Sequence, residues 1–317
     1  MGFKSYKSLG SQNIQNAGSK ISALEVVKPV KQTRLIAGGD ATTTTIALSS
    51  DKGVSWTLPN NQPFTYGGFG RCGFDGKRVV MGGTNNIAYS DDFGMTWVAT
   101  GFSSLNVDFR IIYIVATKLW FAVGYSNANN VIAYSSDGAN WILSNIMINQ
   151  QRCADIIYNG SVYIASVLGD YPTATSSDGI TWAYNTSYQL MTSASRRFTF
   201  DFTYDGSRYI FGTSGYTTTK NIATSPDGIT WSDTAYLPMD VRRIAYNGVD
   251  TYVAVGGASS GISSPIYYYW SNDLITWYPA NNNLLGTTVF NGRMERNVFR
   301  NRWYKKIRFD NKYNIFC

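Results

Sequence analysis

The sequence predicts an all-β fold made of repeated four-stranded units, and three observations support that prediction. A phrase typified by Ile-Ala-Thr-Ser-Pro-Asp-Gly-Ile-Thr-Trp, at Ile222–Trp231, occurs six times in the 317 residues. Its closing tryptophans are 41, 44, 41, 49 and 46 residues apart. Between the phrases, apolar runs alternate with Asn-Gly or Asp-Gly pairs and with polar loops. A period of about 40–50 residues with these turn signals is typical of a β-propeller of four-stranded antiparallel blades.

The first two strands of each unit are expected to form a hairpin. The first strand ends in an aromatic residue followed by Asp-Gly or Asn-Gly, as in Tyr204-Asp-Gly206 and Tyr246-Asn-Gly248. These dipeptides are the preferred two-residue hairpin turns. An apolar second strand follows, as in Tyr252–Gly256, and a polar loop leads to the third. This order puts the hairpin turns and the turns of the repeated phrase at one end of the blades, and the links between blades at the other. We expect function at the link end, where loops vary most.

The repeated phrase itself predicts the third strand, a tight turn and the fourth strand. Its Ser and Asp offer oxygen atoms to nearby backbone N–H groups, its Gly tolerates a positive φ angle, and its Trp buries a large surface. The structural pairs are Asp51 and Trp56, Asp92 and Trp97, Asp137 and Trp141, Asp178 and Trp182, Asp227 and Trp231, and Asp273 and Trp277. The sixth turn has Leu274 where Gly is expected.

The pattern Ser-x-Asp-x-Gly-x-Thr-Trp resembles the Asp-box, or BNR repeat, of bacterial neuraminidases. That repeat also occurs in sortilin-type receptors, some glycanases and a photosystem assembly factor. The spacing is complete in Ser49–Trp56 and Ser90–Trp97, and the three following copies are one residue shorter. The resemblance covers roughly residues 34–300. It implies a propeller in which the box is a structural turn on the face away from any active site.

The blade count and the domain organisation rest on the two ends of the chain. Six phrases indicate six blades, but Val298–Ile307 has the pattern of a further first strand, turn and second strand. Seven blades are therefore favoured, and six are the alternative. Residues 1–20 are predicted to be an extended arm. Residues 21–317 are predicted to form one propeller domain closed by the C-terminal segment, with Ile21–Val27 as the first strand of the initial blade.

The formal net charge of +7 is concentrated at the ends of the chain. Residues 1–33 carry five Lys and one Glu (+4), and residues 292–317 carry eight Lys or Arg and two acids (+6), so the body is −3. We therefore expect protein partners at the basic N- and C-terminal segments and consider nucleic acid an unlikely partner.

The cysteines and the absence of targeting signals bear on location. Three cysteines without local pairing suggest free thiols and a reducing compartment. No membrane span and no classical signal peptide are apparent. A cytoplasmic location, or incorporation into a virion or another assembly, is expected.

The composition excludes several kinds of chemistry. Histidine is absent, which excludes His-based triads and His-ligated metal. No metal site, cofactor or catalytic residue is predicted. A neuraminidase-like site needs a Tyr–Glu pair, an acidic Asp and three arginines that hold a carboxylate, but Glu occurs only at Glu25 and Glu295. Enzymatic activity is therefore not favoured.

Arginines at a repeated position are the candidate ligand site. Arg71, Arg110, Arg243 and Arg296 each precede the aromatic residue that closes a first strand by three residues, and Arg152 and Arg197 lie further upstream of theirs. First strands line the channel of a propeller, so these arginines are candidates for an anion or ligand site. The alternative is that each pairs with an aspartate as a link between blades, for example Asp75, Asp108, Asp155 or Asp240.

Two functions remain open from the sequence. The favoured one is a non-catalytic propeller that acts as a structural or binding component of a larger assembly, for which a virion surface or capsid-associated protein is one form. The alternative is a neuraminidase-like glycoside hydrolase or a protein that binds an acidic glycan. Two carboxylates about 5–10 Å apart beside three arginines would favour the enzyme.

Overall fold

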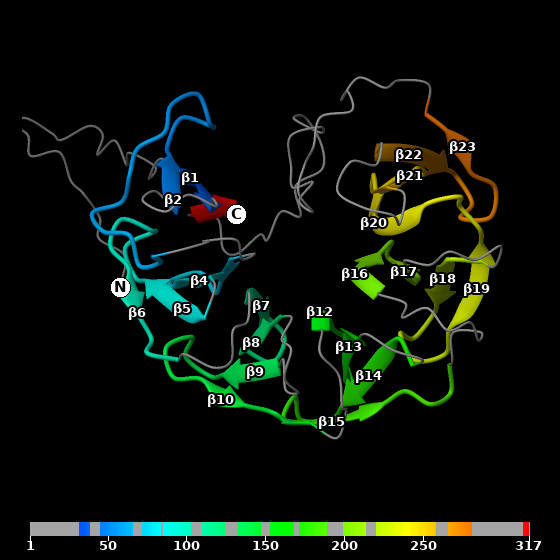
Figure 1. Cartoon of the computed structure of the whole chain (residues 1–317), viewed down its shortest axis with the longest axis horizontal. Coiled ribbons are helices and arrows are strands. Elements are labelled where there is room, and N and C mark those ends of the chain that lie inside the picture. The colour runs from blue at the N-terminus through cyan, green and yellow to red at the C-terminus, as the bar shows by residue number, and fades with distance from the viewer. Residues whose placement is uncertain are drawn as a thin grey trace, which may run out of the picture.

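In the computed structural model, six sheets follow one another around a common centre (Figure 1). The structure describes residues 32–38, 45–65, 72–83, 85–102, 109–124, 132–146, 153–167, 171–188, 199–213, 220–257, 266–280 and 313–316. These ranges contain strands and no helix, and hence no helix long and apolar enough to cross a membrane. The predicted all-β propeller fold is confirmed.

Four sheets have four antiparallel strands in chain order. The first of these contains β3 (Gly73–Phe74), β4 (Val79–Gly83), β5 (Asn86–Ser90) and β6 (Val98–Ala99). The next contains β7 (Arg110–Ile114), β8 (Leu119–Val123), β9 (Ile132–Ser135) and β10 (Ile142–Leu143). Two more contain β16 (Thr199–Tyr204), β17 (Tyr209–Thr213), β18 (Ile222–Ser225) and β19 (Ser232–Ala235), and β20 (Asp240–Tyr246), β21 (Tyr252–Gly257), β22 (Ile266–Ser271) and β23 (Tyr278–Pro279).

The remaining two sheets depart from this pattern. One contains β12 (Cys153–Tyr158), β13 (Tyr163–Val167), β14 (Thr173–Ser176) and β15 (Thr181–Tyr184), and β11 (Asn145–Ile146) pairs in parallel with the outer side of β15. The other has β1 (Gln32–Gly38) between β2 (Ile46–Ser49) and β24 (Tyr313–Phe316). A bridge between Leu48 and Thr57 stands where its fourth strand would be.

The first sheet is closed by the C-terminal end of the chain. β24 pairs in parallel with β1, from Gln32 with Tyr313 to Leu35 with Phe316. β2 and β24 pair with the two edges of β1. Ile21–Val27, predicted as the first strand of the initial blade, lies outside the described residues.

The described strands do not test the number of blades. The strands drawn in Figure 1 leave an opening in the ring between the sheet of β1 and the sheet of β20–β23. Residues 298–307, the predicted start of a seventh blade, and the arm at residues 1–20 both lie outside the described residues. Seven blades, with six as the alternative, therefore stays a prediction.

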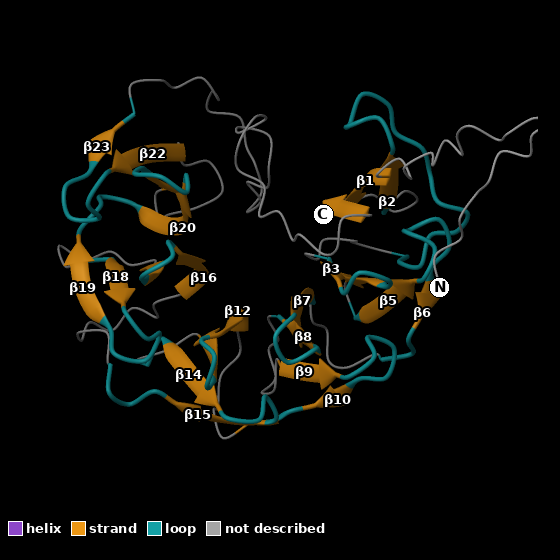
Figure 2. Ribbon diagram, turned by 180° about the vertical axis from the view of Figure 1, so that it is seen from behind, coloured by secondary structure: helices purple, strands orange, loops and turns teal. Residues whose placement is uncertain are grey.

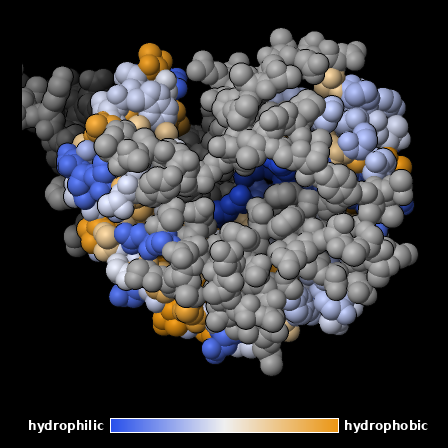
Figure 3. All heavy atoms as spheres, viewed as in Figure 1, coloured by the Kyte–Doolittle hydropathy of each residue, from blue (hydrophilic) through white to orange (hydrophobic). Residues whose placement is uncertain are grey.

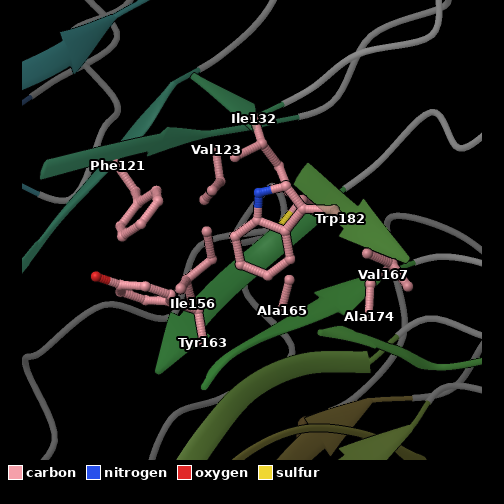
Figure 4. Packing of buried hydrophobic residues seen from close by; sticks show 10 residues of the cluster. Phe121, Val123, Ile132, Ile156, Tyr163, Ala165, Val167, Ala174 and Trp182 are labelled. Carbon is pink, nitrogen blue, oxygen red and sulfur yellow. The ribbon is translucent and has the colours of Figure 1, made fainter. Parts of the chain in front are cut away.

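Apolar side chains from neighbouring sheets pack between them. In Figure 4, Trp182 lies among residues of its own sheet and Phe121, Val123 and Ile132 of the sheet before it. Phe121 meets Trp182 edge-to-face, with ring centroids 6.2 Å apart. Close approach of the sheets also requires glycine. A Cβ atom at Gly82 would lie 2.3 Å from the backbone oxygen of Phe109 in the next sheet.

The hairpin turns and the turns of the repeated phrase lie at the same end of the sheets, as predicted. Arg78, which follows the first hairpin turn of its sheet, pairs with Asp91 at 2.8 Å and donates to the backbone oxygen of Asp137 in the next sheet at 2.7 Å. The amide of Asn159 likewise donates to the backbone oxygen of Asp227 at 2.8 Å. These contacts join the sheet of β3–β6 to that of β7–β10, and the sheet of β12–β15 to that of β16–β19.

The cysteines differ from the prediction of free thiols. Cys153 is free and buried, but Cys72 is disulfide-bonded, and its partner lies outside the described residues. The spacing of cysteines along a sequence does not reveal pairs that only the fold brings together. The disulfide removes the sequence argument for a reducing compartment.

Candidate anion site in the channel

In four consecutive sheets, the first antiparallel strand is the innermost one. Figure 2 shows β7, β12, β16 and β20 closest to the centre of the ring. The position three residues before the closing aromatic of these strands holds Arg110, Asp155, Asp201 and Arg243. Two cations and two carboxylates therefore occupy equivalent places on four consecutive inner strands.

Asp201 brings the two described arginines together. Its Oδ1 atom lies 3.2 Å from Nη1 of Arg110, and its Oδ2 atom lies 2.9 Å from Nη2 of Arg243. The three side chains come from β7, β16 and β20. Arg110 reaches past the intervening strand β12, where Nη1 also donates to the backbone oxygen of Ala154 at 3.4 Å. One carboxylate thus joins three sheets at the inner side of the ring.

This Arg110–Asp201–Arg243 cluster is partly open to solvent and carries excess positive charge. The side chains of Arg110 and Arg243 are 31% and 35% exposed, whereas that of Asp201 is 10% exposed. Two guanidinium groups and one carboxylate sum to +1. Figure 3 shows hydrophilic side chains within the hollow centre of the molecule. An anion that contacts both guanidinium groups there meets the excess positive charge of these three side chains.

Bulges in the inner strands shape this region. The register shifts between Cys153 and Asp155 in β12, between Thr199 and Phe202 in β16, and between Val241 and Arg243 in β20. A bulge bends the strand and redirects the side chains beside it. Asp155, Asp201 and Arg243 all stand at such shifts.

Asp155 has a structural role although it shares the position of Asp201. It is only 3% exposed, and its carboxylate accepts from the backbone N–H of Ile156 at 3.1 Å and of Phe202 at 3.2 Å. Because Phe202 belongs to the next sheet, this carboxylate links β12 to β16. Such hydrogen bonds satisfy buried N–H groups that would otherwise be costly.

The predicted arginine set is only partly described. Arg110 and Arg243 meet on Asp201, while Arg71, Arg152, Arg197 and Arg296 lie outside the described residues. Both described arginines pair with an aspartate, as the alternative interpretation expected. The aspartate is Asp201, which is not among those named from the sequence. A signal was present: Asp201 lies three residues before Tyr204, in the same register as the arginines.

The turns of the repeated phrase form the hydrogen bonds predicted for them. In the fifth turn, Asp227 Oδ1 accepts from the backbone N–H of Thr230 at 2.6 Å and of Ile229 at 2.8 Å. Ser225 donates to the same oxygen at 2.8 Å and accepts from the N–H of Gly228 at 2.8 Å. The same Ser–Asp bond occurs in all six turns, between Ser49 and Asp51, Ser90 and Asp92, Ser135 and Asp137, Ser176 and Asp178, Ser225 and Asp227, and Ser271 and Asp273.

These hydrogen bonds lower the pKa values of the turn aspartates. Burial opposes ionisation of Asp227, but the N–H groups of Thr230 and Ile229 outweigh it and lower its pKa to about 2. The hydroxyl and the N–H of Ser55 lower the pKa of Asp51 to about 2. A carboxylate held ionised by its own turn is suited to a structural role and not to proton transfer.

The sixth turn keeps its geometry without glycine. Leu274 has a φ angle of 67°, its N–H donates to Ser271 at 2.9 Å, and its side chain is fully buried. The five glycines in equivalent places have φ angles between 74° and 89°. Packing of the Leu274 side chain offsets the cost of a left-handed conformation, which is about 1–2 kcal/mol for a residue with a Cβ atom.

The tryptophans of the turns differ in burial. In the second to fifth turns, the indole N–H donates to the glycine oxygen of its own turn: Trp97 to Gly94, Trp141 to Gly138, Trp182 to Gly179, and Trp231 to Gly228. Trp56 is 45% exposed, whereas Trp231 is 6% exposed. The prediction of a structural tryptophan therefore applies most weakly to the first turn.

The part of the chain that is described contains no group of three or more His, Cys, Asp or Glu residues that could hold a metal ion. The predicted lack of a metal site and of a cofactor receives no test beyond that observation.

Comparison with known proteins identifies the fold and no family. No family model matches the chain, and no curated protein matches it. A GH74 xyloglucanase from Xanthomonas campestris superposes with a TM-score of 0.56 at 14% identity, covering 73% of this chain and 41% of the enzyme. YCF48 bound to D1 peptide gives 0.52 at 16% identity, covering 79% and 82% of the two chains.

A third similar structure is the extracellular domain described as part of a one-component system from B. thetaiotaomicron. It gives a TM-score of 0.50 at 14% identity and covers 78% of this chain and 34% of that chain. This protein thus spans less than half the length of the xyloglucanase and of the B. thetaiotaomicron protein. Identities this low indicate a shared propeller architecture and not a shared activity.

Proposed function

We propose that this chain is a non-catalytic propeller that binds an acidic ligand at the Arg110–Asp201–Arg243 cluster. The observation that carries the proposal is the meeting of two arginines from different sheets on one carboxylate, with a net charge of +1 for these three side chains. Guanidinium groups suit carboxylate and sulfate ligands because their N–H donors match the geometry of these anions.

The engagement of the nearby carboxylates favours binding over hydrolysis. A glycosidase needs one carboxyl group as acid and another as base or nucleophile. Here Asp201 is paired with two guanidinium groups, and Asp155 accepts two backbone N–H bonds. Both carboxylates act as hydrogen-bond acceptors in these contacts, whereas a glycosidase acid must donate a proton. The neuraminidase-like alternative therefore has less support than binding.

The comparisons agree with a binding role in one respect. The structure of YCF48 was determined with a peptide, and this chain matches 82% of that protein. The xyloglucanase is matched over 41% of its length. A peptide ligand is therefore included among the candidates, beside an acidic glycan. We also propose that the six turns are Asp-boxes, on the basis of their common Ser–Asp and Asp–backbone hydrogen bonds.

The role in a larger assembly belongs to the same proposal. The basic ends, at residues 1–33 and 292–317, carry +10 against −3 for the rest of the chain. They would attract an acidic protein partner in a salt-dependent way. The virion or capsid form of this idea has no observation in its support beyond the sequence, so the general form is proposed.

Binding of a fluorescent hexaglutamate peptide and of a sialylated oligosaccharide tests the proposal. The wild type should bind at least one of them, and the Arg110→Ala/Arg243→Ala double variant should lose at least tenfold in affinity. The control is Lys77→Ala/Lys118→Ala, which removes two exposed charges from hairpin turns at the opposite end of the sheets. The channel site would be refuted if both double variants lost affinity equally. It would also be refuted if the wild type bound neither the peptide nor the oligosaccharide.

A further inference from the structure

We infer that Asp201 acts as an internal competitor at this site and makes it selective for ligands with several negative groups over single carboxylates. The inference rests on the proposed anion site and adds a residue that decides which anions it accepts. In this inference, the carboxylate of Asp201 occupies the place that a ligand's carboxylate would otherwise take.

Asp201 lies between the two arginines and contacts both. Each oxygen of Asp201 meets one guanidinium group, Arg110 at 3.2 Å and Arg243 at 2.9 Å, and the two arginines come from different sheets. An external carboxylate placed between these arginines would form the same two contacts. A single carboxylate must therefore displace Asp201 or accept poorer contacts at the outer sides of the guanidinium groups.

The strand holds Asp201 in place. The N–H of its neighbour Phe202 donates to Asp155 at 3.2 Å, and the Phe202 ring stacks on Trp231 with centroids 5.8 Å apart. A group fixed in this way competes as if present at millimolar concentration or above, on the order of a tethered ligand. A weakly bound monoanion cannot overcome that competition at lower concentrations.

The same geometry leaves a route for larger anions. About a third of each arginine side chain is exposed, so both can donate further hydrogen bonds while Asp201 stays in place. A ligand with adjacent carboxylates can contact Arg110 and Arg243 at once and gain from both. The chemistry that fits is a chain of closely spaced carboxylates, supplied either by an acidic peptide or by a polyuronic acid.

Asp201→Asn tests the inference because it keeps the shape of the side chain and removes its charge. Calorimetric titration with acetate and with citrate measures the preference for several carboxylates over one. Wild type should prefer citrate strongly. In Asp201→Asn, acetate affinity should rise by about tenfold or more and the preference for citrate should narrow. Titration with hexaglutamate and with oligogalacturonate then distinguishes the two sources of the polyanion.

Asp91→Asn is the matched control, because it also removes one carboxylate paired with an arginine but lies at the turn end of the sheets, 2.8 Å from Arg78. It should leave both affinities unchanged. Melting temperatures of all variants establish that they are folded.

The failure of this inference is separable from that of the proposed function. If citrate binding depends on Arg110 and Arg243 but Asp201→Asn binds acetate no better than wild type, Asp201 has only a structural role and the inference is wrong. If neither wild type nor Asp201→Asn binds citrate through these arginines, the anion site itself is wrong.

Discussion

A short side chain that satisfies its own turn is the smallest structural unit of this protein. Asp227 and its five counterparts accept backbone N–H bonds within their own turns, so each turn carries its own stabilising group. Such local bonds do not depend on long-range structure. For that reason the sequence pattern alone predicted which aspartates are structural.

The channel cluster is predictable only in part, for a physical reason. The register of Arg110 and Arg243 can be read from sequence, and that of Asp201 could have been read the same way. The pairing of these side chains cannot be read from the sequence, because Arg110 reaches beyond the neighbouring sheet to a residue 91 positions away. Which side chain a long arginine contacts depends on the curvature of the ring and on bulges that leave no clear mark in the sequence.

The turn aspartates predict an acid-labile fold. The folded pKa values of Asp51, Asp205 and Asp227 lie at about 2, below the usual value of 3.8. A carboxylate with a depressed folded pKa stabilises the native state above the unfolded pKa, and this contribution disappears as the pH falls from about 4 to about 2. The melting temperature should therefore be nearly constant from pH 7 to 5 and fall below pH 4. A melting temperature that rises between pH 4 and 2 would contradict this assignment.

Leu274 provides a test of the sixth turn. Leu274→Gly relieves a left-handed conformation, which is worth about 1–2 kcal/mol, but loses a buried side chain, which is worth about 2–5 kcal/mol. Net destabilisation of about 1–3 kcal/mol is expected in urea unfolding. A variant more stable than wild type would mean that the side chain contributes little and that the turn only tolerates leucine.

At the scale of strands and sheets, the repeated tryptophan anchors the fourth strand unevenly. Trp231 is 6% exposed and contacts Phe202 and Phe211, whereas Trp56 is 45% exposed. Trp231→Ala should therefore cost roughly 3–5 kcal/mol through the cavity it leaves. Trp56→Ala, the matched control at the same place in the repeat, should cost less than about 2 kcal/mol. Equal losses measured by denaturant unfolding would show that burial does not govern these positions.

The order of the antiparallel strands within a sheet can be predicted from the sequence, whereas the two parallel pairings cannot. Hairpin turns force consecutive strands to pair, so the four regular sheets have the predicted order. The pairing of β11 with β15 and of β24 with β1 involves segments with no turn between them. Nothing local specifies such pairs, which form because the edges of β15 and β1 are otherwise open.

For the molecule as a whole, deletion of residues 1–20 distinguishes two roles of this segment: docking on a partner and closing the propeller. If the arm docks on an acidic partner, its deletion should abolish assembly and leave the melting temperature of the isolated protein unchanged. Binding through the basic ends should also weaken as salt rises, since exposed charges are screened over about 8–10 Å. A large fall in melting temperature after deletion would instead show that the arm belongs to the fold, and the docking proposal would fail.

Anion binding at the Arg110–Asp201–Arg243 cluster is the property on which the proposed function depends. Crystals of wild type and of Asp201→Asn, soaked in selenate, test this directly through the anomalous signal of selenium. Anion binding at this cluster predicts a peak within hydrogen-bonding distance of both guanidinium groups in Asp201→Asn and a weaker peak there in wild type. Selenate peaks elsewhere on the surface, with none between Arg110 and Arg243 in either crystal, would contradict it.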